Sequence, residues 1–206
     1  MCIRDRYPDQ LDSYTSLLIH SDTVNDAYMM LDSSDTGHEI SRYGHTQHRV
    51  GQKRFGKSSI FFDGTTDYLV VQPSGATGMN FGTSAFTIDC WVYPTDATGA
   101  KQCLAAKHLN DGNCWVWGID GNDIEMYYRT GYGGYTQVFT GAHGMSSNNW
   151  YHLALVRVSS TSWITFVDGV SKATSSTNVD LTSSHSSTFV IGYTDNEWGG
   201  AGNDYY

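Results

Sequence analysis

Basic residues are scarce in this sequence, and their scarcity limits the partners that the protein can bind. The chain of 206 residues contains 12 Lys and Arg against 21 Asp and Glu, which gives a formal net charge of −9. Binding to nucleic acid phosphates requires clustered Lys and Arg, so we expect no nucleic acid partner. Long apolar runs are also missing. None approaches the ~20 residues of a membrane-spanning helix, and we expect no membrane insertion.

Sequence patterns that mark common catalytic and metal sites are absent as well. The chain has neither the G-x-S-x-G pattern of serine hydrolases nor the H-E-x-x-H pattern of zinc proteases. Its four cysteines do not have zinc-site spacing. Cys103 and Cys114 flank an expected hairpin turn at residues 109–113, where strand pairing does not place them opposite each other. Because a disulfide requires Cα atoms within ~7 Å, we expect free thiols.

Helical periodicity is a further absence, since no segment has the 3.6-residue period of a long helix. Charged residues make up only 16% of the chain, aromatic residues make up 14%, and there are 22 glycines. This composition favours short strands joined by polar turns, and the spacing predicts a single all-β domain, an antiparallel β-sandwich. We expect residues 45–54 to form a polar connection. The expected strands are residues 17–20, 40–43, 59–62, 68–71, 86–93, 102–107, 114–119, 124–129, 135–139, 150–158, 163–167 and 188–193.

Four segments carry a resemblance to a known family. They are FGKSSIFFDGTTDYLVV at residues 55–71, FTIDCWVYP at 86–94, WYHLALVR at 150–157 and ITFVDG at 164–169. In order and wording they resemble the laminin-G-like (LamG-like), concanavalin A-like lectin/glucanase jelly-roll family, over residues 17–193. The resemblance implies a concanavalin A-like jelly roll. This fold hosts lectins, adhesion modules, glycanases and spacers, so function has to be argued from the site.

The resemblance also suggests domain boundaries. We interpret residues 1–13 as a leader, either a linker or an artefact, and residues 14–206 as a single LamG-like domain. In the resembled family the last strand carries a G-x-I/M-D-E/D-x-R pattern and pairs with the first strand. The sequence ends in GGAGNDYY without this pattern. We therefore expect a C-terminal truncation that leaves the first strand as an exposed edge.

Calcium is the cofactor that the resemblance implies, because several relatives bind it. Calcium takes six to eight oxygen ligands from carboxylates and backbone carbonyls in loops. The matching acidic turns contain Asp22, in HSDTVND, and Asp63 with Asp67, in FDGTTD. The alternative interpretation is that Asp63 and Asp67 only shape their turn by hydrogen bonding to the local backbone.

Two loops have the composition of a carbohydrate site, in which aromatic rings stack on sugar faces and polar groups bind hydroxyls. One loop, RTGYGGYTQ, contains Tyr132 and Tyr135. Trp115 and Trp117 share one strand face, so both are core residues or both are exposed, and the sandwich core is the simpler interpretation. The other loop, GYTDNEWGG, contributes Asp195, Asn196, Glu197 and Trp198.

Paired carboxylates are the feature that would indicate a glycoside hydrolase. The sequence DGNDIEMYY contains Asp120, Asp123 and Glu125, and the last two share a strand face. The simpler interpretation is a turn followed by solvent-facing strand residues, since surface Asp and Glu are the default. We interpret His152 as a structural histidine of the resembled W-x-H strand, and we expect no catalytic residue.

These observations favour a non-catalytic recognition or adhesion module that binds a glycan or a protein surface. The resemblance implies that it belongs to a larger extracellular, cell-surface or virion protein with other domains. One alternative is a structural spacer or oligomerisation module of a fibre or adhesin. A glycoside hydrolase is the other alternative.

Overall fold

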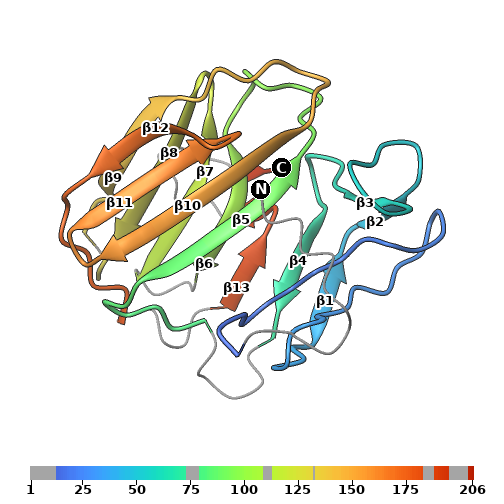
Figure 1. Cartoon of the computed structure of the whole chain (residues 1–206), viewed down its shortest axis with the longest axis horizontal. Helices are drawn as coiled ribbons and strands as arrows, with labels where there is room; N and C mark the ends of the chain where they lie inside the picture. The colour runs from blue at the N-terminus through green and yellow to red at the C-terminus, as the bar shows by residue number, and fades with distance from the viewer. Residues whose placement is uncertain (1–12, 73–78, 109–112, 132, 183–187, 195–203) are drawn as a thin grey trace.

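A computed structural model shows two antiparallel β-sheets packed face to face, with the four-stranded sheet in front of β6 to β9 of the seven-stranded sheet (Figure 1). This arrangement confirms the predicted antiparallel β-sandwich of the concanavalin A-like type. The structure describes residues 13–72, 79–108, 113–131, 133–182, 188–194 and 204–206.

The larger of the two sheets has seven strands. Its spatial order is β1 (Ile40–Tyr43), β4 (Tyr68–Val71), β13 (Thr188–Ile191), β6 (Gln102–His108), β7 (Cys114–Asp120), β8 (Asp123–Arg129) and β9 (Thr136–Ala142).

The remaining strands form the second layer and two small ribbons. The four-stranded sheet has the order β12 (Val170–Ser175), β11 (Ser162–Val167), β10 (Tyr151–Ser159) and β5 (Phe86–Val92). The two-stranded ribbons are β2 (Gln47–Arg49) with β3 (Ser59–Phe61), and β14 (Tyr193–Thr194) with β15 (Asp204–Tyr205).

The core lies between the two large sheets and is built from alternate strand residues. Trp115 and Trp117 of β7 and Trp163 of β11 are all fully buried in it. Because successive strand residues face opposite sides, the tryptophans at positions 115 and 117 enter the core together, as predicted. Tyr128 also packs against this core from β8.

The arginine of the W-x-H strand has a structural role. Arg157 is buried, and its guanidinium donates hydrogen bonds to the carbonyl oxygens of Gly82, at 2.7 Å, and Val179. The same group lies 4.6 Å from the ring centre of Trp163. Burial lowers the pKa of Arg157, although Asp180 opposes that shift. The arginine therefore ties two loops to the end of the sandwich.

The turn between β11 and β12 has the sequence Asp-Gly, which is typical of a tight hairpin. Asp168 and Gly169 both have positive φ, of 48° and 76°, which is the backbone of a type I′ turn. Asp168 Oδ1 also accepts a hydrogen bond from the backbone N–H of His152, at 2.8 Å. The His152 ring lies 3.2 Å from Asp89 Oδ1, consistent with its interpretation as a structural residue.

Three sequence-based predictions of secondary structure were wrong. Residues 17–20 form no named strand, and only the bridge between Ile19 and Asp32 pairs them. Residues 45–54 contain β2, which we had expected to be connection, and β12 was missed because VSKATS has no apolar alternation. Within the described residues, no helix is long and apolar enough to span a membrane.

The cysteines in the described part of the chain form no disulfide, as predicted for Cys103 and Cys114. Cys103 and Cys114 are buried and Cys90 is half-buried, and none forms a disulfide. The observed register pairs Cys103 with Gly118, which explains why the two thiols of this hairpin do not meet. Burial, followed by the charge of Asp89, raises the pKa of the Cys90 thiol to about 12.

Candidate binding surface

The outer face of the seven-stranded sheet carries a continuous set of polar and aromatic side chains. On β8, Ile124 and Met126 enter the core, so the alternate residues Glu125, Tyr127 and Arg129 face outward. Neighbouring strands and loops add further residues to the same surface. We name this surface the polar stripe, and its members are Lys101, Asp120, Glu125, Tyr127, Arg129, Tyr135 and Gln137.

Charge and hydrogen bonding organise the middle of the polar stripe. Lys101 Nζ lies 3.3 Å from Asp120 Oδ2 and 3.8 Å from Glu125 Oε1, so one ammonium contacts two carboxylates. Gln137 Nε2 donates a hydrogen bond to the Tyr127 hydroxyl at 2.7 Å. These contacts hold the side chains in defined positions on the sheet, which is the preorganisation that recognition requires.

Glu125 differs from the expected solvent-facing carboxylate. It is only 4% exposed, and its Oε1 atom is buried without a hydrogen-bond partner in the described structure. Burial raises the pKa of Glu125, Lys101 opposes the shift, and the charges of Asp120 and Asp123 add to it. The prediction that this carboxylate faces solvent was therefore wrong, although the pattern did place Asp123 and Glu125 near each other.

Tyr135 lies at the other end of the polar stripe, next to Arg129. The guanidinium carbon of Arg129 is 5.0 Å from the Tyr135 ring centre, and Cys114 Sγ donates to the Tyr135 hydroxyl at 3.4 Å. Arg129 also borders a shallow hollow with Thr130 and Asp180, which has no room to enclose a ligand. A ligand here would therefore lie on the surface.

Three tyrosines stack on one another, two from the seven-stranded sheet and one from the β14–β15 ribbon. The rings of Tyr43 on β1 and Tyr68 on β4 are 4.5 Å apart and nearly parallel, at 2°. Tyr193 on β14 stacks on the other side of Tyr68, at 4.6 Å and 24°. Leu69 and Val71 of β4 are core residues, so Tyr68 and its two neighbours lie on the outer face. We name these residues the tyrosine ladder.

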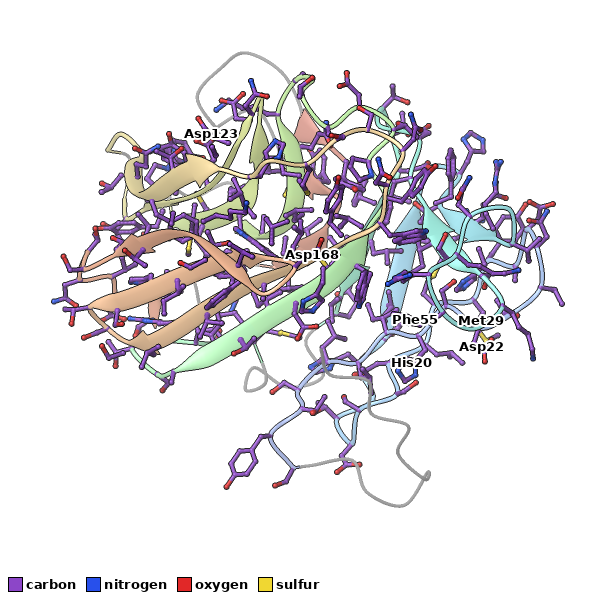
Figure 2. All side chains as sticks on the ribbon, turned by 45° about the horizontal axis from the view of Figure 1, so that its top comes forward. His20, Asp22, Met29, Phe55, Asp123 and Asp168 are labelled. Atoms are coloured by element: carbon purple, nitrogen blue, oxygen red, sulfur yellow. The ribbon has the colours of Figure 1, made fainter. Side chains whose placement is uncertain are left out.

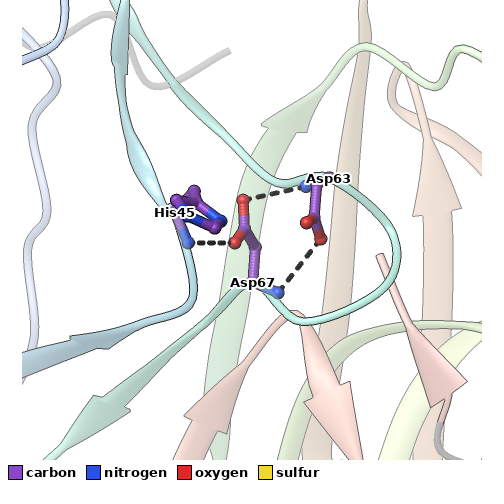
Figure 3. Close-up of side chains that lie close together, drawn as sticks. All are labelled: His45, Asp63 and Asp67. Carbon is purple, nitrogen blue, oxygen red and sulfur yellow. Dashed lines mark hydrogen bonds between the residues drawn. The ribbon is translucent and has the colours of Figure 1, made fainter.

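The turn before Tyr68 brings two predicted metal ligands together (Figure 3). Asp67 is buried, and its carboxylate accepts hydrogen bonds from the backbone N–H groups of His45, at 2.5 Å, and Asp63, at 3.0 Å. Asp63 Oδ1 accepts from the N–H groups of Thr65, Thr66 and Asp67. Although burial opposes it, this hydrogen bonding lowers the pKa of Asp63 to about 2. The bonds are those of a carboxylate that shapes its own turn.

A metal ion at this turn would have a mixed set of ligands. The ligand atoms of His45, Asp63 and Asp67 all lie within 4.8 Å of one another. Two carboxylates suit calcium, but calcium prefers an all-oxygen shell of six to eight ligands, and imidazole suits transition metals. Asp22 does not join this group. It is exposed beside Phe55 in Figure 2, and its Oδ1 accepts from the Lys57 N–H at 2.8 Å.

Most of the predicted carbohydrate-binding residues cannot be placed. Of that set only Tyr135 is described, and it is half-buried. The strands that flank the second loop, β14 and β15, pack against β6 of the seven-stranded sheet. The predicted residues that lie outside the described part of the chain are Tyr132, Asp195, Asn196, Glu197 and Trp198.

Sequence reasoning missed several residues that the structure brings to this surface. Arg129 alternates with Tyr127 along one strand, so the period-two pattern could have identified this arginine. The tyrosine ladder could not be found in this way, because its members come from three strands that are distant in sequence. His45 was likewise missed, since only the tertiary structure places it beside Asp67.

Comparison with known proteins agrees with this fold. A family model described as the concanavalin A-like lectin/glucanases superfamily matches residues 63–205. The chain belongs to this superfamily. The match covers both large sheets apart from β1, so the polar stripe lies on a concanavalin A-like framework. No curated protein matches the chain.

Solved structures similar to this superfamily member include binding domains of botulinum neurotoxins. The receptor-binding domain of neurotoxin D shares 11% identity at a TM-score of 0.56, covering 79% of this chain and 41% of that one. A second structure is of neurotoxin type C, and its title reports cell entry dependent on two ganglioside molecules. It shares 13% identity at a TM-score of 0.59, covering 90% of this chain and 43% of that one. The binding domain of neurotoxin DC in complex with rat synaptotagmin II shares 12% identity at a TM-score of 0.60, covering 90% of this chain and 44% of that one. At this identity the likeness shows the fold, and the chain spans less than half of each structure.

Proposed function

We propose that this domain is a non-catalytic recognition module that binds a glycan through the polar stripe. The observation that carries the proposal is the close association of Tyr127 and Tyr135 with Gln137 and Arg129 on one outward face. Aromatic rings provide stacking surface for the apolar faces of sugars, and amide and guanidinium groups bind hydroxyls. The titles of the similar structures name receptor-binding domains, which supports recognition of a glycan or a protein surface.

The context that we propose is a longer extracellular, cell-surface or virion protein with other domains. Support comes from the solved structures, each more than twice as long as the part that this chain matches. Calcium remains a proposal as well. The carboxylates of Asp63 and Asp67 would supply two of its oxygen ligands, while Asp22 would bind separately or not at all.

The direct test is a glycan array probed with the chain in calcium and in chelator. We expect saturable binding that Tyr135→Ala and Arg129→Ala each abolish, while Tyr14→Ala, a change at an exposed tyrosine far along the chain, leaves it intact. Loss of wild-type binding in chelator would support the calcium proposal. Absence of glycan binding by a folded sample would favour a protein partner or a structural spacer.

A glycoside hydrolase is the second candidate, and one observation favours it. Glu125 is a buried carboxyl with a raised pKa, as a general acid requires, and Lys101 contacts both it and Asp120. Because both carboxylates contact the same ammonium, they are closer together than ~9.5 Å, the upper limit for the separation of the two catalytic carboxyl groups in inverting glycosidases. Reducing-sugar release from glycans bound on the array tests it. Turnover that Glu125→Gln abolishes would establish an enzyme, and no turnover by the wild-type chain would exclude hydrolysis of those glycans.

A further inference from the structure

Exposed cations are concentrated in the hairpin formed by β2, β3 and their connecting loop. Although the chain has a net charge of −9, residues 40–62 contain five Lys and Arg and no Asp or Glu. Four of the five lie between residues 49 and 57, and all four are exposed. None of them forms an ion pair with a carboxylate of the described residues. We name this group the basic patch, and its members are Arg49, Lys53, Arg54 and Lys57.

Exposed apolar side chains lie beside the basic patch. Phe55, inside the same loop, is 50% exposed, and Val24 and Met29, from the segment before β1, are each 71% exposed. Figure 2 shows Phe55 and Met29 on one side of the molecule. An apolar side chain that exposes most of its surface projects from a convex region, because a groove would cover it. Such positions differ from the packed pockets in which protein interfaces bury their hot-spot residues.

Two hydrogen bonds hold the exposed apolar segment against the hairpin. The Val50 N–H donates to Asn25 Oδ1 at 3.2 Å, and the Lys57 N–H donates to Asp22 Oδ1 at 2.8 Å. Residues 22–29 contain two carboxylates, against the four cations of the hairpin. The combined surface therefore carries apolar side chains and an excess of positive charge.

Stacking holds one cation of the basic patch in place. The Arg54 guanidinium carbon lies 5.3 Å from the ring centre of Phe55 and 4.7 Å from that of Trp91. Its N–H groups donate no hydrogen bond to any described residue. Rings cover the faces of a guanidinium and leave its edges open, and those edges are what binds a phosphate through two hydrogen bonds.

We propose that the basic patch binds the anionic phospholipid headgroups of a membrane, with Phe55, Val24 and Met29 entering the headgroup region. Lys and Arg are attracted to an anionic leaflet, and apolar side chains gain burial at the interface. A lipid surface deforms around a convex region, so it needs no groove on the protein. The contact is peripheral and requires no membrane-spanning segment. It is independent of the glycan proposal, because it uses none of the residues of the polar stripe.

Vesicle co-sedimentation of the whole chain tests the proposal. The vesicles contain phosphatidylcholine alone or phosphatidylcholine with about 30 mol% phosphatidylserine, which gives the surface a negative potential. We expect binding to the anionic vesicles only. Raising the salt concentration from ~0.1 M to ~0.5 M should release most of the bound protein, because exposed charges are screened.

Two sets of substitutions test the two parts of the surface. Each neutralised cation should weaken vesicle binding about fivefold, so Lys53→Gln with Lys57→Gln should weaken it about 25-fold. These lysines make no ion pair with a described residue, so the variant should fold normally. Phe55→Ala should weaken binding roughly fivefold through lost apolar burial.

The matched controls change the same residue types elsewhere. Lys172→Gln and Val170→Ala, both on β12, should leave vesicle binding unchanged. Tyr135→Ala should also leave it unchanged, even where it abolishes glycan-array binding.

Three results would overturn the proposal. The first is equal binding of the folded chain to neutral and anionic vesicles, or binding to neither. The second is unchanged binding by the folded double lysine variant. The third is binding to soluble polyglutamate as tight as binding to anionic vesicles, with no response to Phe55→Ala, which would indicate an acidic protein partner instead of a membrane.

Discussion

Two regions of this molecule are held together by different forces. The buried members of the main core cluster begin at Val71 and continue through the two large sheets to Phe189. The N-terminal region, residues 13–62, contributes no buried member to this cluster, and most of the exposed large apolar side chains belong to it. They include Val24, Tyr28, Met29, Leu31 and Phe55.

In the N-terminal region, hydrogen bonds between side chains and the backbone provide the stabilising contacts that apolar packing provides in the sandwich. The side chain of Asp32 is fully buried and accepts hydrogen bonds from the N–H groups of Leu18, Ser34 and His38, each at 2.8 or 2.9 Å. The His48 ring bonds to Ser21 Oγ at 2.6 Å and lies 2.9 Å from a backbone carbonyl. Such bonds are directional, so this region depends on a few specific residues.

Apart from the pairing of β1 with β4, the two regions share an aromatic contact. Phe55 packs edge-on against Trp91 of β5, with ring centres 5.3 Å apart, and Arg54 lies 4.7 Å from the Trp91 ring centre. In Figure 2, Phe55 lies with Met29, His20 and Asp22 on one side of the sandwich. Apolar burial has no preferred direction, so the stability of the sandwich should tolerate conservative substitutions. The stability of the N-terminal region should fall sharply when a single polar group is lost.

The largest expected effect is in the sandwich. Trp117→Ala should lower the free energy of unfolding by about 3–5 kcal/mol, because a fully buried ring leaves a cavity. Trp117→Phe should cost much less, since the indole N–H has no hydrogen-bond partner to lose in the described structure. Urea unfolding of both variants measures the difference. Equal costs would contradict a core held by apolar packing.

Lys107 tests how the sandwich tolerates a buried charge. Its ammonium donates to the Met79 carbonyl at 3.0 Å and to Asn80 Oδ1, and burial lowers its pKa to about 8. The unfolded chain then binds more protons between that pH and ~10.4, so this residue makes stability rise with pH across that window. We expect the wild type to gain roughly 3 kcal/mol relative to Lys107→Met between pH 7 and pH 11.

Urea unfolding of both proteins at those two pH values measures this gain, because ionisations common to the two chains cancel. A pH-independent difference between wild type and Lys107→Met would show that the ammonium is not desolvated in the folded state.

Asp32→Ala should loosen the N-terminal region without unfolding the sandwich. Removal of a carboxylate that binds several backbone N–H groups costs about 2–3 kcal/mol. The effect should appear as faster hydrogen exchange within residues 16–38, while β10 and β11 stay protected. Asp35→Ala, at an exposed neighbour, is the control. Simultaneous loss of protection in both regions would show that they unfold as one unit.

Acid should produce the same local loosening in the wild type. Although burial opposes it, hydrogen bonds from Leu18, Ser34 and His38 lower the pKa of Asp32 to about 2. Because the folded pKa lies below the ordinary ~3.9, the stabilisation is complete above about pH 4 and is lost as pH falls towards 2.

The smallest effect compares two glycines that both have positive φ. Gly44→Ala should destabilise the protein by about 1–2 kcal/mol more than Gly121→Ala, because only the first would place a Cβ against Asp67 and Thr66. The strain of a left-handed alanine is common to both variants and cancels. Thermal unfolding gives the comparison, and equal destabilisation would contradict close packing of the two turns that support the tyrosine ladder.

The sandwich was far more predictable than the N-terminal region, for the same physical reason. Apolar and polar residues alternate along residues 86–93 and 163–167, and this local pattern predicts a strand with one buried face. The observed strands, Phe86–Val92 and Ser162–Val167, have nearly the same bounds. Residues 17–20 were wrongly predicted as a strand because their apolar run lacks a pairing partner apart from one bridge. Where polar groups hold the backbone, hydrophobic pattern carries little information.

The sequence by itself determined the fold class, the burial of Trp115 with Trp117, and the Asp-Gly hairpin at residues 168–169. Each follows from period-two alternation or from turn chemistry between near neighbours. Only the tertiary structure decided that Tyr43, Tyr68 and Tyr193 stack. It likewise decided that Lys101 contacts a buried Glu125. These contacts depend on sheet order and register between distant strands, which no local pattern encodes.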